Sequence, residues 1–207
     1  MNLTEKIKIT NEDNMELMAR YPDNYFELAI IDPPYRDENQ PTKDMRINGS
    51  MKSLEGRPTN NYWNELYRVS KNQIIWGANN FQLPQWKGFV VWKKKTISEV
   101  FTMSMCEIAS ISENLGTTSK WIEIAPQGTA EDPRIHPTQK PYKLYEWLLM
   151  NYAKEGDNIL DTHLGSGSIA IACHNLGFQL TACELDKDYF DSAIKRIKNH
   201  ISQQRLF

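Results

Sequence analysis

The sequence has little of three features that would set a chain apart from ordinary globular proteins. It has only three cysteines, and their spacing fits neither a disulfide framework nor a metal site, so a reducing, cytoplasmic setting without a bound metal is expected. No apolar run approaches the roughly 18 residues of a membrane-spanning helix, so no membrane association is predicted. An excess of either charge is also missing, because the formal net charge is −2 over 207 residues. A surface for nucleic acid would therefore have to come from local clustering of basic residues.

One segment shows such clustering. Residues 86–95 read Trp-Lys-Gly-Phe-Val-Val-Trp-Lys-Lys-Lys, with four lysines and no acid. A strand that ends in a solvated run of charge explains this pattern equally well. The polar stretch 36–60, which is expected to be a long loop, adds further basic residues. The candidate nucleic-acid contacts are Lys87, Trp92, Lys93, Lys94, Lys95, Arg46 and Arg57.

Apolar runs and helical periodicities alternate along the chain, most clearly in its last third. Such alternation predicts an α/β domain with a mainly parallel sheet. Residues 113–136 show neither pattern and are expected to be irregular. Strands are expected at 7–10, 26–31, 73–76, 88–92, 106–112, 158–161 and 180–184. Helices are expected at 14–20, 62–69, from 141 onward, at 169–176 and at the carboxyl end.

A glycine-containing loop follows one of the late strands. Asp161 ends the strand, and Thr-His-Leu-Gly-Ser-Gly-Ser leads into the next helix. Gly165 and Gly167 would let the backbone approach a ligand at the helix N-terminus, and Glu184 follows at about the 20-residue spacing of an acid that binds ribose hydroxyls. A plain turn between strand and helix is the simpler alternative. A nucleoside triphosphatase loop is disfavoured because no Gly-Lys-Ser/Thr is present.

The tetrapeptide Asp32-Pro33-Pro34-Tyr35 directly follows the apolar run 26–31. It fits an ordinary Pro-Pro turn, but its residue types also suit the activation of an aromatic amine as a nucleophile. An aromatic exocyclic amine is a poor nucleophile because its lone pair is delocalised, and acceptors that hold its N–H bonds out of plane favour attack. The Asp32 carboxylate and the Pro33 carbonyl would supply such acceptors from a rigid turn, and the carboxylate would oppose positive charge developing on nitrogen. Tyr35 could stack on a base flipped out of a duplex.

Together these motifs resemble those of the amino-methyltransferase family of DNA modification enzymes, over most of the chain. Asp32 to Tyr35 matches the catalytic motif, and His-Pro-Thr-Gln-Lys-Pro at 136–141 matches the helix-opening motif beside the cofactor methionine. Residues 161–168 are similar to the glycine-rich motif, Glu184 to the ribose-binding acid, and Asp13 to the acid near the cofactor adenine. The catalytic motif precedes the glycine motif, which is the permuted order of the β class.

The resemblance implies the Rossmann-like α/β fold of class I S-adenosylmethionine-dependent methyltransferases, with a mixed seven-stranded sheet, one strand of it antiparallel, in a single domain over residues 1–207. It implies S-adenosyl-L-methionine as cofactor and double-stranded DNA as partner, with transfer to N6 of a flipped adenine. Target recognition is expected from 36–60 and 85–135, and a homodimer and a cognate restriction endonuclease are candidate partners that the sequence leaves open. Residues 68–77 resemble small phage and prophage DNA adenine methylases. The implied cofactor-binding residues are Asp13, His136, Thr138, Lys140, Asp161, His163, Leu164, Gly165, Ser166, Gly167, Ser168 and Glu184.

The glycine motif departs from the family pattern, because Thr162, His163 and Ser168 replace the usual Pro, Phe and Thr. His163 is expected to pack as a flat ring, with a pH-sensitive role as the alternative. Trp63 and Trp121 are expected to be packing residues, like Trp147. The alternatives for function are a cytosine-N4 DNA methyltransferase, a methyltransferase for protein glutamine or an RNA amine, and an inactive module that only binds DNA or cofactor.

Overall fold

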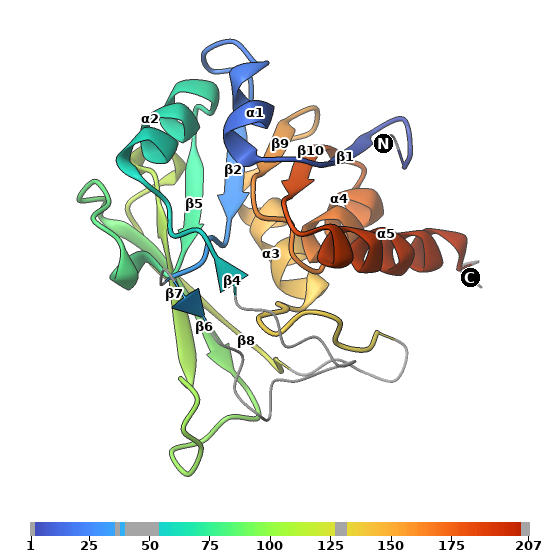
Figure 1. Cartoon of the computed structure of the whole chain (residues 1–207). Coiled ribbons are helices and arrows are strands. Elements are labelled where there is room, and N and C mark those ends of the chain that lie inside the picture. Colours follow the sequence, from blue (N-terminus) through green and yellow to red (C-terminus); the bar gives the residue numbers. More distant parts are fainter. Residues whose placement is uncertain (1–2, 36–37, 40–53, 127–131, 204–207) are drawn as a thin grey trace.

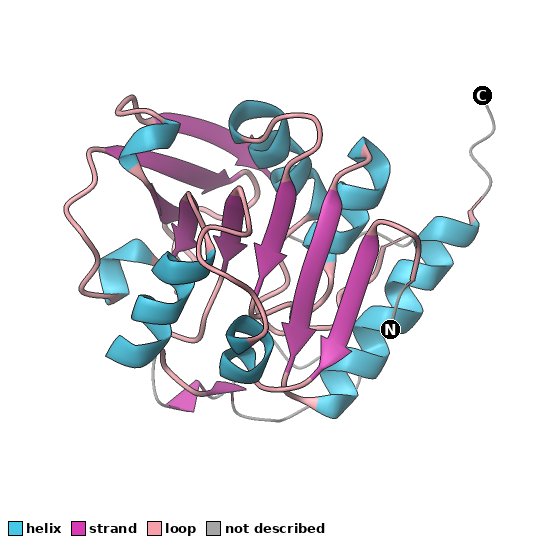
Figure 2. Ribbon diagram, turned by 90° about the horizontal axis from the view of Figure 1, so that it is seen from above, coloured by secondary structure: helices cyan, strands magenta, loops and turns pink. Residues whose placement is uncertain are grey.

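A computed structural model describes residues 3–35, 38–39, 54–126 and 132–203 of the chain. An eight-stranded sheet runs through the described part, and helices lie on both of its faces (Figure 1, and seen from above in Figure 2). The strands are β1 (Ile7–Asn11), β2 (Leu28–Ile31), β5 (Gln73–Trp76), β6 (Gly88–Lys94), β7 (Cys106–Ile111), β8 (Lys120–Ile124), β9 (Asn158–Asp161) and β10 (Gln179–Glu184), with a separate pair β3 (Glu38–Asn39) and β4 (Leu54–Glu55). The helices are α1 (Asn14–Ala19), α2 (Asn60–Val69), α3 (Tyr142–Tyr152), α4 (Ser168–Leu176) and α5 (Lys187–Ser202), with short 3-10 turns η2 (Ala78–Asn80) and η3 (Glu113–Leu115).

The strands of the large sheet follow the order β1-β10-β9-β2-β5-β7-β6-β8. Strand β7 runs antiparallel to both of its neighbours, and all other neighbouring pairs are parallel. The prediction of one antiparallel strand is confirmed, but the expected number of seven strands is wrong. The eighth strand is β8, which lies in the stretch expected to be irregular. It is an edge strand with one neighbour and a mostly exposed surface, so it lacks the apolar pattern of an inner strand.

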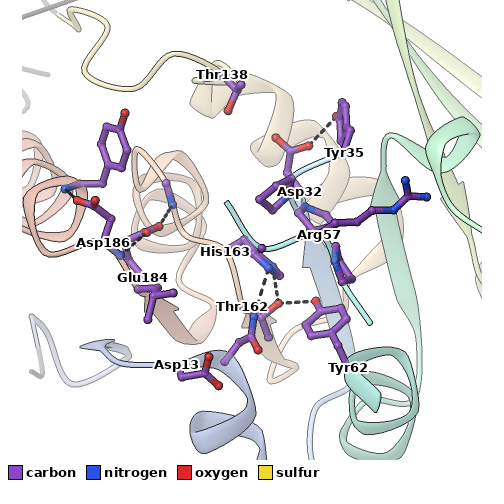
Figure 3. Close-up of a pocket in the computed structure, with 18 of the residues that line it drawn as sticks. Asp13, Asp32, Tyr35, Arg57, Tyr62, Thr138, Thr162, His163, Glu184 and Asp186 are labelled. Atoms are coloured by element: carbon purple, nitrogen blue, oxygen red, sulfur yellow. Dashed lines mark hydrogen bonds between the residues drawn. The ribbon is translucent and has the colours of Figure 1, made fainter. Parts of the chain in front are cut away.

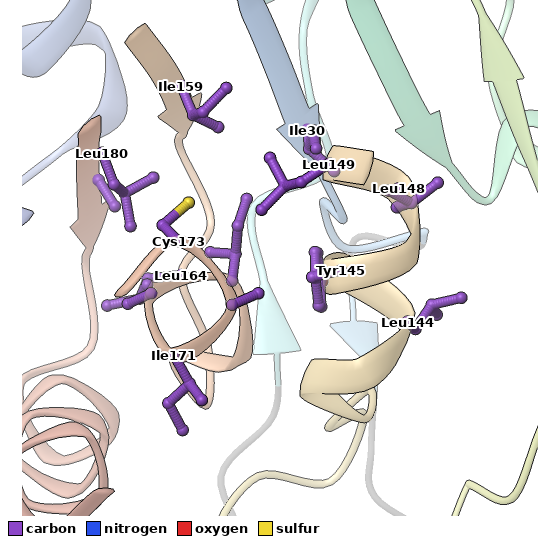
Figure 4. Close-up of a cluster of buried hydrophobic side chains, with 14 of the residues drawn as sticks. Ile30, Leu144, Tyr145, Leu148, Leu149, Ile159, Leu164, Ile171, Cys173 and Leu180 are labelled. Atoms are coloured by element: carbon purple, nitrogen blue, oxygen red, sulfur yellow. The ribbon is translucent and has the colours of Figure 1, made fainter. Parts of the chain in front are cut away.

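The central strands read as continuous apolar runs because helices cover both of their faces. All four residues of β2 and all four of β5 are buried. Helices α3, α4 and α5 pack on one face of the sheet, where Figure 4 shows Ile30 facing Leu148 and Leu149 of α3. Helices α1 and α2 pack on the other face around a second apolar cluster that includes Leu17 and Leu66. No helix in the described residues is long and apolar enough to cross a membrane.

Parallel strands bring their carboxyl ends to a common edge, and this edge collects the polar motifs of the chain. Asp32 follows β2, Asp161 ends β9 and Glu184 ends β10. These three strands are neighbours in the sheet, so residues far apart in the sequence lie side by side. The β3–β4 pair, within the segment expected to be a loop, lies toward the same edge (Figure 1).

Candidate active site

A cavity of about 840 Å³ opens at the carboxyl edge of the sheet. In Figure 3, Asp32 and Tyr35 lie on one side of it and Glu184 and Asp186 on the other, with His163 between them. Small-molecule sites occupy roughly 300–1,000 Å³. The cavity is therefore large enough for an organic ligand that reaches from the glycine loop to the Asp-Pro-Pro-Tyr turn.

The two carboxylate oxygens of Asp32 have different partners. The Tyr35 hydroxyl donates to Oδ1 at 2.8 Å, and the Lys140 ammonium group donates to Oδ2. The Tyr35 ring rests against Gly77, which has φ +68°, and any Cβ at this position would overlap the ring. Burial and then the Asp32 charge raise the pKa of Tyr35, so its hydroxyl stays protonated and donates. Gly77 thus provides the space that lets Tyr35 reach Asp32.

Four charged side chains of alternating sign, Asp32, Lys140, Glu107 and Lys94, form a continuous row that we call the charge row. Lys140 Nζ binds Asp32 and lies 3.0 Å from Glu107 Oε2, while Lys94 Nζ lies 2.6 Å from Glu107 Oε1. Burial acts to raise the pKa of Glu107, but the two lysines outweigh it and lower that pKa to about 2. Burial raises the pKa of Asp32, Lys140 opposes this effect, and the Glu107 charge adds to it.

A chain of hydrogen bonds runs along another wall of the cavity. The hydroxyls of Tyr62 and Thr162 are 2.6 Å apart, Thr162 Oγ1 is 2.9 Å from His163 Nδ1, and Asn14 Nδ2 is 3.3 Å from His163 Nε2. The Tyr62 ring meets the His163 ring edge-on, with their centroids 5.3 Å apart. Burial lowers the pKa of His163 to about 3, so the ring is neutral near neutral pH. This environment favours a packing role for His163 over a pH-sensitive one.

The glycine loop is fastened to the neighbouring strand by Glu184. Its Oε2 accepts a hydrogen bond from the Gly165 N–H at 2.8 Å, and its Oε1 accepts one from the Asp186 N–H at 3.0 Å. Gly167 has φ +77°, and a Cβ there would lie 2.7 Å from Ile197 Cδ1 of α5. The loop therefore requires glycine at this position for its conformation and for its approach to α5.

Arg196 of α5 holds the loop from behind. Its Nη1 donates to the Ser166 carbonyl at 2.8 Å and to Ser168 Oγ at 3.0 Å. Its Nε and Nη2 donate to the two carboxylate oxygens of Asp132 at 2.6 and 2.7 Å. The Ser168 hydroxyl donates in turn to the Lys140 carbonyl at 2.6 Å. The loop and the segment before α3 are thus fixed to each other.

Three further predicted cofactor residues, His136, Thr138 and Asp13, face the cavity from other elements. His136 lies against the Tyr189 ring, with ring centroids 4.4 Å apart, and burial together with nearby cations lowers its pKa to about 3. Thr138 donates its N–H to His136 Nδ1 at 3.3 Å. Asp13 begins α1 as its N-cap, accepting the Met15 N–H at 2.7 Å. His136, Thr138 and Asp13 are predicted cofactor residues, and they line the cavity together with Met15 and Tyr189.

Most predicted site residues therefore meet at one cavity, although some do not face it. Asp161 is buried and accepts the His163 N–H at 2.9 Å, and burial raises its pKa to about 8. The predicted residues that line the cavity are Asp13, Asp32, Pro33, Pro34, Tyr35, Arg57, His136, Thr138, Lys140, His163, Gly165 and Glu184. Those that do not line it are Asp161, Leu164, Ser166, Gly167 and Ser168, which form the loop or support it from behind.

The structure also brings in residues that the sequence did not suggest. Glu107 and Tyr62 line the cavity, and Arg196 supports it. Each lies on an element whose position depends on distant packing, so no local motif marks them. Lys140, a predicted cofactor residue, lines the cavity, and its side chain binds Asp32 and Glu107.

Two of the predicted nucleic-acid contacts are wrong. Trp92 is 1% exposed and its indole N–H donates to the Ile124 carbonyl at 2.9 Å, so it belongs to the core. Lys94 is buried in the charge row. Successive side chains of a strand point to opposite faces, so Lys94 points away from its neighbours in the sequence. Lys87, Lys93 and Lys95 are exposed and remain candidate contacts.

The other basic candidates lie at the cavity or outside the described residues. Arg57 lines the cavity and donates to the Asn80 carbonyl at 2.7 Å, whereas Arg46 lies outside the described part of the chain. Trp63 is buried as expected, but Trp121 on β8 is 65% exposed, so its assignment as a packing residue is wrong.

Comparison with known proteins agrees with this geometry. YubD of Escherichia coli K12, which carries a methylase name, is 24% identical over 201 residues that cover 89% of this chain and 87% of YubD. The PvuII DNA methyltransferase, described as cytosine-N4-specific, has a TM-score of 0.68 at 10% identity, covering 99% of this chain and 89% of its own. The M1.HpyAVI complex with SAM has a TM-score of 0.56 at 20% identity, covering 92% of this chain and 99% of that chain.

A family model described as DNA methylase, of the N6/N4 methyltransferase type, matches residues 2–195. The match spans the Asp-Pro-Pro-Tyr turn, the charge row, the glycine loop and Glu184. The two structural likenesses show the same fold. Because the match covers nearly the whole chain, the protein belongs to the family of N6/N4 DNA methylases.

Proposed function

We propose that the protein transfers a methyl group from S-adenosyl-L-methionine to the exocyclic N6 amine of an adenine flipped out of double-stranded DNA. The observation that carries this proposal is the placement of Asp32. Its carboxylate faces a cavity whose opposite side is built by the glycine loop and Glu184. One cavity thus combines an acceptor for an amine with a site suited to a nucleoside.

The residues on the glycine-loop side fit this cofactor. Gly165 has φ +54°, and a Cβ there would meet only the His136 ring at 3.5 Å, so the loop backbone stays open to a ligand. Glu184 and Asp13 place carboxylates in the cavity that suit the ribose hydroxyls and the adenine amine. Bound S-adenosyl-L-methionine supplies a methyl carbon attached to a cationic sulfur. The neutral His136 adds no cation that would repel it.

The residues on the Asp32 side act on the target base. The Tyr35 and Lys140 donors hold the Asp32 carboxylate in place, and a carboxylate has lone pairs to spare for an amine N–H. That contact strengthens as positive charge develops on the nitrogen, so it favours the transition state over the bound base. Arg57 lies at the same side of the cavity and remains a candidate contact to the DNA backbone.

Adenine is preferred over cytosine because Asp rather than Ser leads the catalytic motif, as the family resemblance implies. The comparisons are compatible with either base, since the family includes both activities by name. Digestion of methylated DNA to nucleosides would decide between them. N6-methyladenine is the expected product, and N4-methylcytosine would overturn this part of the proposal.

Replacing Asp32 tests the catalytic assignment. We expect Asp32→Ala to lower tritium transfer from labelled S-adenosyl-L-methionine to DNA by about 100-fold or more. Calorimetry should give a cofactor Kd within about threefold of wild type, because a tenfold loss, about 1.4 kcal/mol, would place Asp32 at the cofactor instead. Asp23→Ala is the control, since Asp23 pairs with Arg68 on the protein surface.

The same assay addresses the other functions. Cofactor binding without transfer to any duplex would favour an inactive binding module. Transfer to proteins or RNA but not to DNA would favour the glutamine or RNA alternative. The homodimer and the partner endonuclease stay predictions, as do the target-recognition roles of 36–60 and 85–135 within a single domain.

A further inference from the structure

Glu107 has no place in the sequence motifs, yet it lies at the centre of the charge row. It sits on β7 opposite Trp92 of β6 and reaches the cavity wall. One of its oxygens pairs with Lys94 and the other with Lys140. A carboxylate in such a position acts on the reaction through the residues that it binds.

We infer that Glu107 is a positioning residue for methyl transfer, which shares the Lys140 ammonium group with Asp32 and so keeps the Asp32 carboxylate a strong acceptor for the base amine. This inference rests on the proposed function. Two aromatic rings hold the cations in the row, because Lys140 Nζ lies 5.3 Å from the Trp76 ring centroid and Lys94 Nζ 5.4 Å from that of Trp92.

The sharing of Lys140 matters because a buried cation with a single carboxylate partner binds it closely and takes up its lone pairs. With Glu107 present, the charge of Lys140 is divided between two carboxylates. Asp32 then keeps more of its electron density for the base. Lys94 balances the second carboxylate, so the row holds two cations and two anions and carries no net charge.

The pH dependence of the reaction reports on this arrangement. Glu107 acts with burial to raise the pKa of Asp32, against Lys140, so loss of the Glu107 charge lowers that pKa. The charged and titratable groups that face Asp32 are Lys140, Glu107, Tyr35, Asp161 and Tyr145. Those that face Glu107 are Lys94, Lys140, Asp32, Arg134, Tyr35 and Tyr145. Removing Glu107 should therefore move the acidic limb of the kcat profile to lower pH while the plateau rate falls.

Two variants separate positioning from stability. Glu107→Gln leaves two buried lysines with one carboxylate, whereas Lys94→Met/Glu107→Gln removes both members of the ion pair and restores charge balance. We expect both to lower kcat by about 10- to 100-fold, as loss of a group that supports a catalytic side chain typically does. Both should shift the acidic limb to lower pH and leave the cofactor Kd within about threefold. Glu107→Asp, which keeps the carboxylate, should retain more activity.

The control is Glu27→Gln at the opposite edge of the sheet. Glu27 is also partly buried and paired with a lysine, 2.9 Å from Lys71, but it lies far from the cavity. Wild-type activity with an unshifted limb in the double variant would overturn the inference. So would a lowered rate with an unshifted limb, because this result would assign Glu107 a purely structural role. If neither wild type nor Glu27→Gln methylates DNA, the proposed function fails instead.

Discussion

Asp161 gives the clearest link between the buried charge of this protein and its stability. The side chain is 3% exposed, and its Oδ1 accepts one hydrogen bond from the His163 N–H at 2.9 Å. Burial outweighs this bond and raises the pKa of Asp161 to about 8. Asp161→Asn keeps an acceptor oxygen in the same place and removes the ionisable group. The variant therefore isolates the cost of ionising a buried carboxylate.

The sign and size of the effect follow from the two pKa values. In the unfolded chain an aspartate has a pKa of about 3.9. Between about pH 4 and pH 8 the folded protein holds a proton that the unfolded chain has released, so its stability falls as the pH rises, by about 1.4 kcal/mol for each pH unit. The contribution of Asp161 is fully present below about pH 4 and is lost as the pH approaches 8. Relative to Asp161→Asn, the wild type should lose about 4 kcal/mol between pH 4 and pH 7.

Urea unfolding of both proteins at a series of pH values measures this difference directly. The free-energy curves of wild type and Asp161→Asn should diverge as the pH rises, with the variant the more stable at pH 7. Asp157→Asn, at the other end of β9, controls for the general effect of replacing an aspartate there. Curves for Asp161→Asn and wild type that run parallel from pH 4 to pH 8 would refute the reasoning.

Three further predictions test other parts of the site. His163→Phe should leave the shape of the activity–pH profile unchanged, because burial lowers the pKa of His163 to about 3. A flattened profile would instead support the pH-sensitive role. Because Trp92 is a core residue, Trp92→Ala should lower the free energy of unfolding, measured by thermal unfolding, by about 3–5 kcal/mol. Lys95→Gln should leave stability unchanged and reduce the slope of log K for DNA binding against log salt concentration by about 1. In Gly167→Ala, the residue would be strained at φ +77°, and its Cβ would lie 2.7 Å from Ile197 Cδ1. This variant should destabilise the fold by about 1–3 kcal/mol and weaken cofactor binding in calorimetry. Unchanged binding would contradict our description of the loop.

The features that could be predicted from the sequence are those that depend on local pattern. Asp32 directly follows the buried strand β2, Asp161 ends β9, and Glu184 ends β10. Because parallel strands align their carboxyl ends, three local patterns were enough to bring these acids to one edge. Gly165 could be placed in the same way, since it lies in the short loop between β9 and α4.

The burial of Lys94, which corrects its prediction as a nucleic-acid contact, follows from the alternation of side chains along β6. Val90, Trp92 and Lys94 are buried on one face of β6, while Phe89 and Lys93 point to the other. A run of lysines at the end of a strand therefore does not form a single surface, because strand geometry has a period of two. The alternation of side chains up to Trp92 indicates that Lys94, two residues later, also points inward.

Glu107, by contrast, carries no local signal. It is a single acid near the start of β7, and its role depends on β7 lying between β5 and β6 in the sheet. That order places it beside Lys94 of the neighbouring strand β6 and beside Lys140, which comes from the segment before α3. Long-range pairing of this kind depends on the completed fold, and strand pattern alone does not specify it.

The position of Lys140 explains why the helix-opening motif belongs to both halves of the site. Its ammonium group holds Asp32 on one side of the cavity, while its carbonyl accepts the Ser168 hydroxyl behind the glycine loop. Asp32 and Lys140 are 108 residues apart in the sequence, so their ion pair is a tertiary contact within the cavity wall. A rigid link of this kind fixes the distance between the glycine loop and the Asp32 carboxylate, which are the cofactor side and the amine acceptor in the proposed function. In-line transfer requires such a fixed distance, because a misplacement of about 1 Å at the reacting atoms can cost 100-fold in rate.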